Sequence, residues 1–233
     1  GLAGYNREAI VTDSFATGNV TATDGVYVGG LVGENLRGDV TGSYATGHVT
    51  GKNTVGGLFG YQYDASVANS YATGNVTGTG TGSIGGLMGS NYENSTVTNC
   101  YSTGTIDSDA YSQGGLIGFA PSGTITGSYF LESAGAGNGN GTPLSQEEMK
   151  QQASFIGWDF NSTPIWKMLR ENETYPRLEW QRENKGDVNG DGVINFTDLI
   201  MSLQVLTSQS SSMMLTEADV DNDGNIGLHE ALY

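Results

Sequence analysis

The sequence predicts an all-β solenoid (β-helix-like, about 28 residues per coil), followed by a small α-helical module. Two observations favour this fold class. A phrase of about a dozen residues recurs through residues 1–140, and a second phrase of the form GGLxG follows each full copy. The character of the chain then changes, because residues 187–233 contain eight Asp or Glu residues and no Lys or Arg.

The repeat period is the strongest of these signals. Copies such as VTDSFATGNVT and VTGSYATGHVT begin 29, 27, 30 and 28 residues apart, within the range of stacked supersecondary units. Stacking would align one aromatic column and one leucine column, which gives a core built from contacts between neighbouring coils. The aromatic column is Phe15, Tyr44, Tyr71, Tyr101 and Tyr129, and the leucine column is Leu31, Leu58, Leu87 and Leu116.

Within one coil, side-chain alternation predicts which residues face the core. Val40 and Tyr44 share one side of an extended strand, and Ala45 lies on the other side. Because an always-apolar and an always-aromatic position share the first side, we expect that side to point inward. A recurrent glycine after this strand predicts a bend, and the glycine pair of GGLxG predicts a close approach of backbones. The bend positions are Gly18, Gly47, Gly74 and Gly104.

The segments between the two phrases, ENLRGD, YQYDAS and SNYENST, vary in length and composition. We expect them to be surface loops, where any binding specificity of the solenoid would lie. A surface polysaccharide is one contact that they could make.

The repeats are predicted to fill residues 1–142, and residues 143–182 are predicted to cap them. Ser145 followed by Glu148 has the pattern of a capping box, which predicts a short helix to about Phe155. The aromatic-rich stretch after it predicts closing strands, since an exposed last coil invites edge-to-edge pairing. Residues 183–186 are expected to be a polar linker to a separate module at residues 187–233.

The composition excludes several classes of partner. The net charge is −16 and only 15% of residues are charged, so the basic footprint needed for nucleic acid or an anionic membrane is missing. No apolar run is long enough for membrane insertion.

The single cysteine, Cys100, occupies a column that is otherwise serine. The chain opens on GLAGY, the end of a GGLxG phrase, and we therefore expect it to be part of a longer protein.

The phrases NSYATGNVTG and VGGLMG resemble the GLUG motif of bacterial surface and secreted proteins, and the resemblance covers roughly residues 1–182. It implies an extracellular or cell-surface location in a bacterium or archaeon. It implies no particular chemistry.

The acidic tail contains two twelve-residue loops with the ligand spacing of calcium sites. Oxygen ligands at positions 1, 3, 5, 9 and 12, a backbone carbonyl at position 7 and a turn glycine at position 6 suit a hard cation that takes six to eight oxygens. The first loop supplies Asp187, Asn189, Asp191, Val193, Asn195 and Asp198, with Gly192 at the turn. The second supplies Asp219, Asp221, Asp223, Asn225 and Glu230, and a water would replace the side chain missing at Gly227. The pair predicts two Ca²⁺ ions.

This EF-hand-like pair resembles a dockerin, in which such loops are duplicated around a helix and aspartate at position 12 is expected. The second loop departs from that pattern at positions 3, 9 and 12. The resemblance implies calcium-dependent docking to a cohesin-like protein receptor. By the same analogy, positions 10 and 11 of each loop flank the docking face, namely Phe196, Thr197, Leu228 and His229.

Several functions remain open from the sequence. The first is a non-catalytic extracellular repeat protein that docks through its tail. The second is a structural subunit of a calcium-dependent filament or sheath, in which copies of the chain join through solenoid ends and the tail. A third is a polysaccharide-active β-helix, which we disfavour because the solenoid offers only Arg7, Arg37 and Lys52 as basic catalytic candidates. In the fourth, the tail is only a stalk module whose loops fold when they bind calcium. We expect no enzyme activity.

Overall fold

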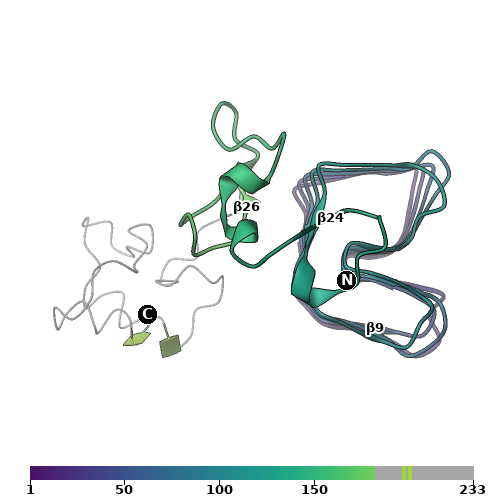
Figure 1. Ribbon diagram of the computed structural model, residues 1–233. Helices are drawn as coiled ribbons and strands as arrows, with labels where there is room; N and C mark the ends of the chain where they lie inside the picture. Colours follow the sequence, from purple (N-terminus) through teal and green to yellow (C-terminus); the bar gives the residue numbers. More distant parts are fainter. Residues whose placement is uncertain (182–195, 198, 201–233) are drawn as a thin grey trace.

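The computed structural model describes residues 1–181, 196–197 and 199–200. Short parallel strands stack coil upon coil into five sheets, and Figure 1 looks along the stacking direction. Residues bonded between neighbouring coils lie 27 to 30 positions apart in the sequence. The predicted all-β solenoid is confirmed.

Each coil passes through the five sheets in the order A, B, C, D, E. Sheet A contains β1 (Ala3–Arg7), β6 (Val32–Leu36), β11 (Phe59–Tyr63), β16 (Met88–Tyr92) and β21 (Ile117–Phe119). Sheet B contains β2 (Ile10–Thr12), β7 (Asp39–Thr41), β12 (Ser66–Ala68), β17 (Thr96–Thr98) and β22 (Thr124–Thr126). Sheet C contains β3 (Phe15–Ala16), β8 (Tyr44–Ala45), β13 (Tyr71–Ala72), β18 (Tyr101–Ser102), β23 (Tyr129–Leu131) and β24 (Thr142–Leu144).

The last two sheets are shorter. Sheet D contains β4 (Val20–Ala22), β9 (Val49–Gly51), β14 (Val76–Gly78) and β19 (Ile106–Ser108). Sheet E contains β5 (Tyr27–Gly29), β10 (Thr54–Gly56), β15 (Ser83–Gly85) and β20 (Ser112–Gly114). The turns between sheets D and E differ in length from coil to coil, and they comprise residues 23–26, 52–53, 79–82 and 109–111.

The interior contains two apolar clusters. The larger lies within sheets A, B and C, and it includes the whole predicted leucine column, in which every member is 0% exposed. The smaller lies between sheets D and E and is built from valine and isoleucine, such as Val49, Val76 and Ile84. Each cluster runs through successive coils, which is how a solenoid buries surface that one coil could not.

The aromatic column does stack, but it lies outside this interior. Between sheets B and C one residue per coil has a left-handed backbone, and this corner ends the first strand. As a result Ala45 joins the core with Val40, and Tyr44 points away from it. The expectation that Val40 and Tyr44 share an inward face was therefore wrong. The corner residues are Asp13, Gly42, Asn69, Asn99 and Gly127, with φ from 46° to 59°.

The predicted bend glycines are positions of close contact between coils. A Cβ atom added at Gly74 would lie 1.9 Å from the carbonyl oxygen of Gly47, whereas one added at Gly18 would meet nothing within 4 Å. The GGLxG pair is equally tight, since a Cβ at Gly57 would lie 2.1 Å from the Gly86 carbonyl oxygen. The contact at Gly57 confirms the close approach of backbones that was predicted for the GGLxG glycine pair.

A ladder of buried amide side chains runs through the solenoid, and three of its four members, Asn35, Gln62 and Asn91, lie in segments for which the sequence predicted only surface loops. The Asn6 amide donates to Asn35 (2.8 Å), Asn35 donates to Gln62 (3.3 Å), and Gln62 donates to Asn91 (3.3 Å). The first three also donate to the main-chain carbonyl three residues further on. The loop prediction was wrong for these residues, because stacking satisfies their buried polar atoms.

Residues after the last coil fold back over it. Strand β24 adds to β23, and η1 (Glu132–Ala134) begins the connecting loop. In that loop the Asn138 side chain donates to the carbonyl oxygens of Gln113, Ile117 and Gly118 at 2.9 to 3.0 Å. These acceptors belong to the free edges of sheets A and E, which the loop thereby blunts.

The capping box forms, but the predicted helix does not. The Ser145 N–H donates to the Glu148 carboxylate (2.8 Å), and the Glu148 N–H donates to the Ser145 hydroxyl (3.2 Å). Two 3₁₀ turns follow instead of one α-helix, η2 (Glu148–Lys150) and η3 (Gln152–Ser154), because Gln151 between them has an extended backbone. A short antiparallel pair, β25 (Trp166–Lys167) and β26 (Arg177–Leu178), closes this part of the chain.

Candidate functional site

The aromatic column forms a stacked ladder on the outer face of sheet C. Ring centroids lie 5.2 Å apart between Phe15 and Tyr44, 5.0 Å between Tyr44 and Tyr71, and 4.9 Å between Tyr71 and Tyr101, with interplanar angles below 10°. The spacing follows from strand separation, about 4.8 Å, because each ring stands on the strand beside the previous one. The ladder leaves a large apolar surface outside the solenoid.

Residues 145–181, the covering segment, lie beside the solenoid on the side of β24 (Figure 1), and their side chains bury most of this ladder. Trp158 and Trp166 stack on each other with centroids 4.1 Å apart, and both contact the ring of Tyr101. Trp180 lies against Phe15 and Tyr44, at the other end of the ladder. The covering segment therefore spans the coils rather than only the last one.

Hydrogen bonds fix the covering segment to the ladder. The Tyr101 hydroxyl donates to the Pro176 carbonyl (2.6 Å), and the Trp180 indole donates to the Gly42 carbonyl (2.8 Å). Burial raises the pKa of Tyr101 well above its ordinary value, which keeps the donor protonated. The Gln181 amide donates to the Tyr71 hydroxyl (2.8 Å). Gln181, the last residue of the described range 1–181, is thus held beside sheet C.

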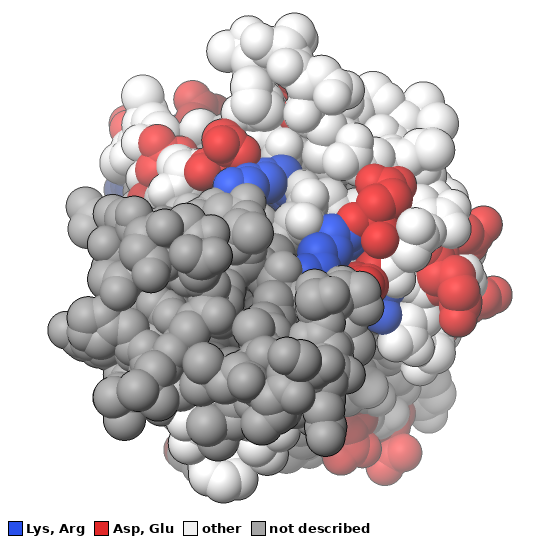
Figure 2. All heavy atoms as spheres, turned by 90° about the vertical axis from the view of Figure 1, so that its left-hand side faces the viewer, with Lys and Arg blue, Asp and Glu red and all other residues white. Residues whose placement is uncertain are grey.

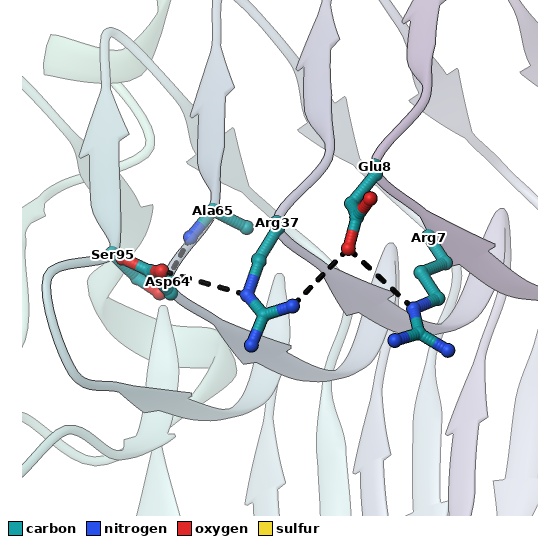
Figure 3. Close-up of polar contacts among 6 residues, drawn as sticks. All are labelled: Arg7, Glu8, Arg37, Asp64, Ala65 and Ser95. Carbon is teal, nitrogen blue, oxygen red and sulfur yellow. Dashed lines mark hydrogen bonds and ion pairs between the residues drawn. The ribbon is translucent and has the colours of Figure 1, made fainter.

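A ladder of alternating charge follows the corner between sheets A and B (Figure 3). The Glu8 carboxylate lies 3.6 Å from the Arg7 guanidinium and 3.1 Å from the Arg37 guanidinium, which is 3.8 Å from the Asp64 carboxylate. All four side chains are about half exposed, so each pair contributes less than about 1 kcal/mol. These arginines, the basic candidates of the sequence, are thus engaged in ion pairs that favour one coil register.

The outer surface of sheets A and E bears a second aromatic group, the tyrosine face. Its members are Tyr5, Tyr27, Tyr61, Tyr63, Tyr92 and Phe119. Tyr61 lies at its centre, with ring centroids 4.5 Å from Tyr27, 6.4 Å from Tyr63 and 5.4 Å from Tyr92. Partial burial, then Tyr27, Tyr92 and the Glu34 carboxylate, raise the pKa of Tyr61 to about 12.

Sequence reasoning missed the tyrosine face because three of its residues, Tyr61, Tyr63 and Tyr92, fell in the supposed loops. A signal was present, since Asn6, Asn35, Gln62 and Asn91 follow one another at 29, 27 and 29 residues, in phase with the repeats. In YQY, a buried Gln62 between Tyr61 and Tyr63 is the alternation of a strand.

Cys100 and His48 continue hydrogen-bond columns of the solenoid. Cys100 is fully buried in the serine column, where its thiol donates to the Thr98 carbonyl (3.2 Å). Burial raises its pKa to about 12, which suits a structural thiol rather than a nucleophile. The His48 Nδ1 accepts the Asn75 N–H (3.1 Å), as Asn19 Oδ1 accepts the His48 N–H in the previous coil.

Most of the predicted calcium ligands and docking residues lie outside the described residues. These are Asp187, Asn189, Asp191, Val193, Asn195, Asp198, Asp219, Asp221, Asp223, Asn225, Leu228, His229 and Glu230. Of the predicted docking residues, Phe196 and Thr197 are described; both are helical, and Phe196 is 72% exposed. Within residues 1–181, 196–197 and 199–200, no group of three or more His, Cys, Asp or Glu is arranged to hold a metal ion.

Comparison with protein families assigns both parts of the chain. Residues 24–50, 51–77 and 80–107 match the GLUG motif, and residues 185–232 match the dockerin type I domain. The chain carries GLUG repeats and a C-terminal dockerin domain. Searches of curated proteins and of solved structures found no match.

The matched ranges agree with the structure and with the predicted loops. Each GLUG range begins near the turn between sheets D and E and passes once through the five sheets, so one motif corresponds to one coil. The dockerin range contains both twelve-residue loops, 187–198 and 219–230. Dockerin type I domains bind calcium and dock to cohesin partners, which supports calcium-dependent docking to a protein.

GLUG repeats and dockerin domains are typical of extracellular or cell-surface proteins. Among the described residues, no helix has the length and apolar character needed to cross a membrane. On the face that bears the covering segment, Lys and Arg side chains lie beside Asp and Glu side chains (Figure 2). The part of this face that is described therefore lacks the continuous basic surface typical of nucleic-acid binding.

Proposed function

We propose that this chain is a non-catalytic extracellular repeat protein that docks, in a calcium-dependent way, to a cohesin-like receptor. The observation that carries the proposal is the dockerin domain at residues 185–232, which encloses two loops with calcium-ligand spacing. The solenoid is the part of the chain that docking would attach to the receptor. Gln181, which precedes the docking module, is held beside Tyr71 by a hydrogen bond.

Two Ca²⁺ ions are proposed, one in each loop. Asp187, Asp191 and Asp198 supply carboxylates to the first loop, and Asp219, Asp221, Asp223 and Glu230 supply them to the second. Carboxylates that share one calcium loop repel one another without a cation, so binding of calcium would be coupled to folding of the module. Titration calorimetry of the chelated protein should give a stoichiometry of two, and Asp187→Ala combined with Asp191→Ala should reduce it to one.

The proposed docking face uses positions 10 and 11 of the loops. Phe196, at one of these positions, is 72% exposed, so its ring is available to a partner. Truncating an aromatic hot-spot side chain at the centre of an interface typically lowers the binding free energy by about 2 kcal/mol or more. Phe196→Ala combined with Leu228→Ala should therefore weaken docking at least about 30-fold.

The test measures binding of the full chain to immobilised type I cohesin domains in calcium and in excess chelator. Binding that needs calcium and is lost in the Phe196→Ala, Leu228→Ala variant supports the proposal. The matched control is Phe119→Ala, which removes a 39% exposed aromatic ring from the solenoid instead. Equal binding with and without calcium, or equal binding by variant and parent, would refute it.

The absence of catalysis is part of the proposal and is supported by how the solenoid uses its polar groups. The inward amides bond to one another along the ladder, and the serine column bonds to main-chain carbonyls, as Ser43 does with Thr41 (2.9 Å). Groups that already serve as structural partners are poor candidates for acid-base or nucleophilic roles. Hydrolysis of a polysaccharide panel by the purified chain would contradict this part.

The second candidate is the filament subunit, in which copies of the chain join through solenoid ends and the C-terminal module. Head-to-tail stacking is opposed at the last coil, where Asn138 already occupies three edge carbonyls. Light scattering at high concentration decides, since polymers that grow in calcium and dissolve in chelator would favour the filament over docking to a different partner.

A further inference from the structure

The tyrosine face is an extended, partly exposed surface for which neither the GLUG nor the dockerin assignment gives a role. Its end members Tyr5 and Phe119 are 47% and 39% exposed, and the rings between them are half-buried against one another. Directly beneath, sheets A and E meet through backbone, since a Cβ at Gly60 would lie 2.4 Å from the Val28 nitrogen. The face is therefore a solid platform. Contiguous exposed aromatic surface of this kind marks an interaction site.

The chemistry of the platform is aromatic and hydroxylic. Tyr61 is in register with Glu34 on one side and Ser90 on the other, and Ser90 is in register with Phe119. Tyr63 lies in register with Tyr92 in a parallel row. Apolar ring surface beside phenol hydroxyls fits a ligand that has apolar C–H surfaces and hydroxyl edges, and the Glu34 carboxylate can accept two neighbouring hydroxyls. Pyranose sugars have this combination.

The platform is also periodic. Its rows run along the solenoid and offer one position per coil, at the separation of neighbouring strands, about 4.8 Å. A linear polymer of pyranoses in extended linkage presents one sugar unit at a similar spacing, whereas a globular protein surface has no such repeat. The charge sets the polymer class, because Glu34 and the chain's net charge of −16 repel uronates and other acidic sugars.

We propose that the tyrosine face binds a neutral, linear polysaccharide of extended pyranose units, with the chain laid along the solenoid axis across Tyr61, Tyr63 and Tyr92. Tyr61 is the central contact, since it neighbours every other ring of the group except Tyr5 and Phe119. This binding is independent of docking, so the solenoid would hold the glycan while the C-terminal domain holds a protein.

The test is affinity electrophoresis of the full chain, with calcium, in gels that contain hydroxyethylcellulose, xylan or polygalacturonate. Retardation by at least one of the two neutral polymers is expected, with little by the acidic one. Tyr61→Ala should weaken binding about tenfold, as truncation of a central aromatic contact does. The combined Tyr61→Ala, Tyr92→Ala variant should abolish it. Tyr61→Phe, which keeps the ring, should retain most of the affinity.

The matched control is Phe15→Ala, which removes a 53% exposed aromatic ring from sheet C. It should bind as the parent does, and circular dichroism should show that the tyrosine variants keep their strands. No retardation by either neutral polymer, a preference for polygalacturonate, or equal losses in Phe15→Ala and Tyr61→Ala would each overturn the proposal. A further outcome would overturn it: neither neutral polymer binds, and sedimentation shows a dimer of the parent that the Tyr61→Ala substitution dissociates. The face would then join two copies of the chain.

Discussion

Replacing Gly74 by alanine should destabilise the solenoid far more than the same change at Gly18, although both glycines hold the same position in their coils. A methyl group at Gly74 would lie 1.9 Å from the Gly47 carbonyl oxygen, and neither glycine has a positive φ that would disfavour alanine by itself. Non-bonded carbon prefers a separation of about 3.5 Å, so the coils would have to part by roughly 1.5 Å.

The flanking hydrogen bonds oppose that movement. The Thr73 N–H donates to the Ala45 carbonyl (3.0 Å) and the Val49 N–H donates to the Asn75 carbonyl (2.9 Å), which joins the same two coils on either side of the glycine. Overpacking costs about 1–3 kcal/mol, and each weakened bond adds about 1 kcal/mol. We therefore expect Gly74→Ala to lower the free energy of unfolding by about 3 kcal/mol or more. Gly18→Ala should change it by less than about 1 kcal/mol, and a small gain is consistent with a less flexible unfolded chain.

Urea unfolding followed by far-ultraviolet circular dichroism measures the difference. With a slope of about 2 kcal/mol per molar urea, a loss of 3 kcal/mol lowers the midpoint by about 1.5 M. Equal midpoints for Gly74→Ala and Gly18→Ala would show that the coils can separate at little cost, and would refute the reasoning from close contact.

Three further predictions concern buried polar groups. Tyr101→Phe leaves the Pro176 carbonyl without its donor. It should lower the free energy of opening of the covering segment, measured by hydrogen exchange, by about 1–3 kcal/mol. Tyr44→Phe, at a partly exposed ring, should change that free energy little. The native Cys100 thiol should not react with a disulfide reagent at pH 8 and should react in urea, because its pKa is raised to about 12; prompt native labelling would contradict its burial. Burial also raises the pKa of Tyr71 and Tyr101 above the unfolded value of about 10, so the unfolded state loses these protons first. Their contribution to stability is complete below pH 10 and should fall as the pH rises further, which thermal melts across that range would detect; a flat profile would count against buried hydroxyls.

The repeat period was enough to predict the solenoid and its leucine column. A constant spacing of 27 to 30 residues forces equivalent positions into contact, whatever the path of the coil between them. The capping-box residues were also predictable, because the Ser145–Glu148 pair is local. The calcium loops followed from ligand spacing, since each is encoded by twelve consecutive residues, and the dockerin assignment followed from the resemblance of that pair to the family.

The direction of side chains was harder to predict, because one backbone conformation per coil decides it. Alternation along a single strand placed Tyr44 with Val40, but a left-handed residue at Gly42 intervenes and reverses the assignment. Aspartate, asparagine and glycine all occupy this corner, so no single residue type marks it. The tyrosine face was missed for a related reason. Polar residues such as Asn35 and Gln62 look like loop residues until stacking supplies their hydrogen-bond partners.

The turns between sheets D and E have a practical consequence for protein engineering. Residues 23–26, 52–53, 79–82 and 109–111 differ in number, yet the strands on both sides stay in register from coil to coil. Foreign peptides inserted there would leave the stack intact, as loop insertions at exposed tips generally do. Because one such turn recurs per coil, inserted epitopes would be displayed in single file at intervals of about 4.8 Å. The solenoid is thus a scaffold on which short peptides can be presented at a fixed spacing.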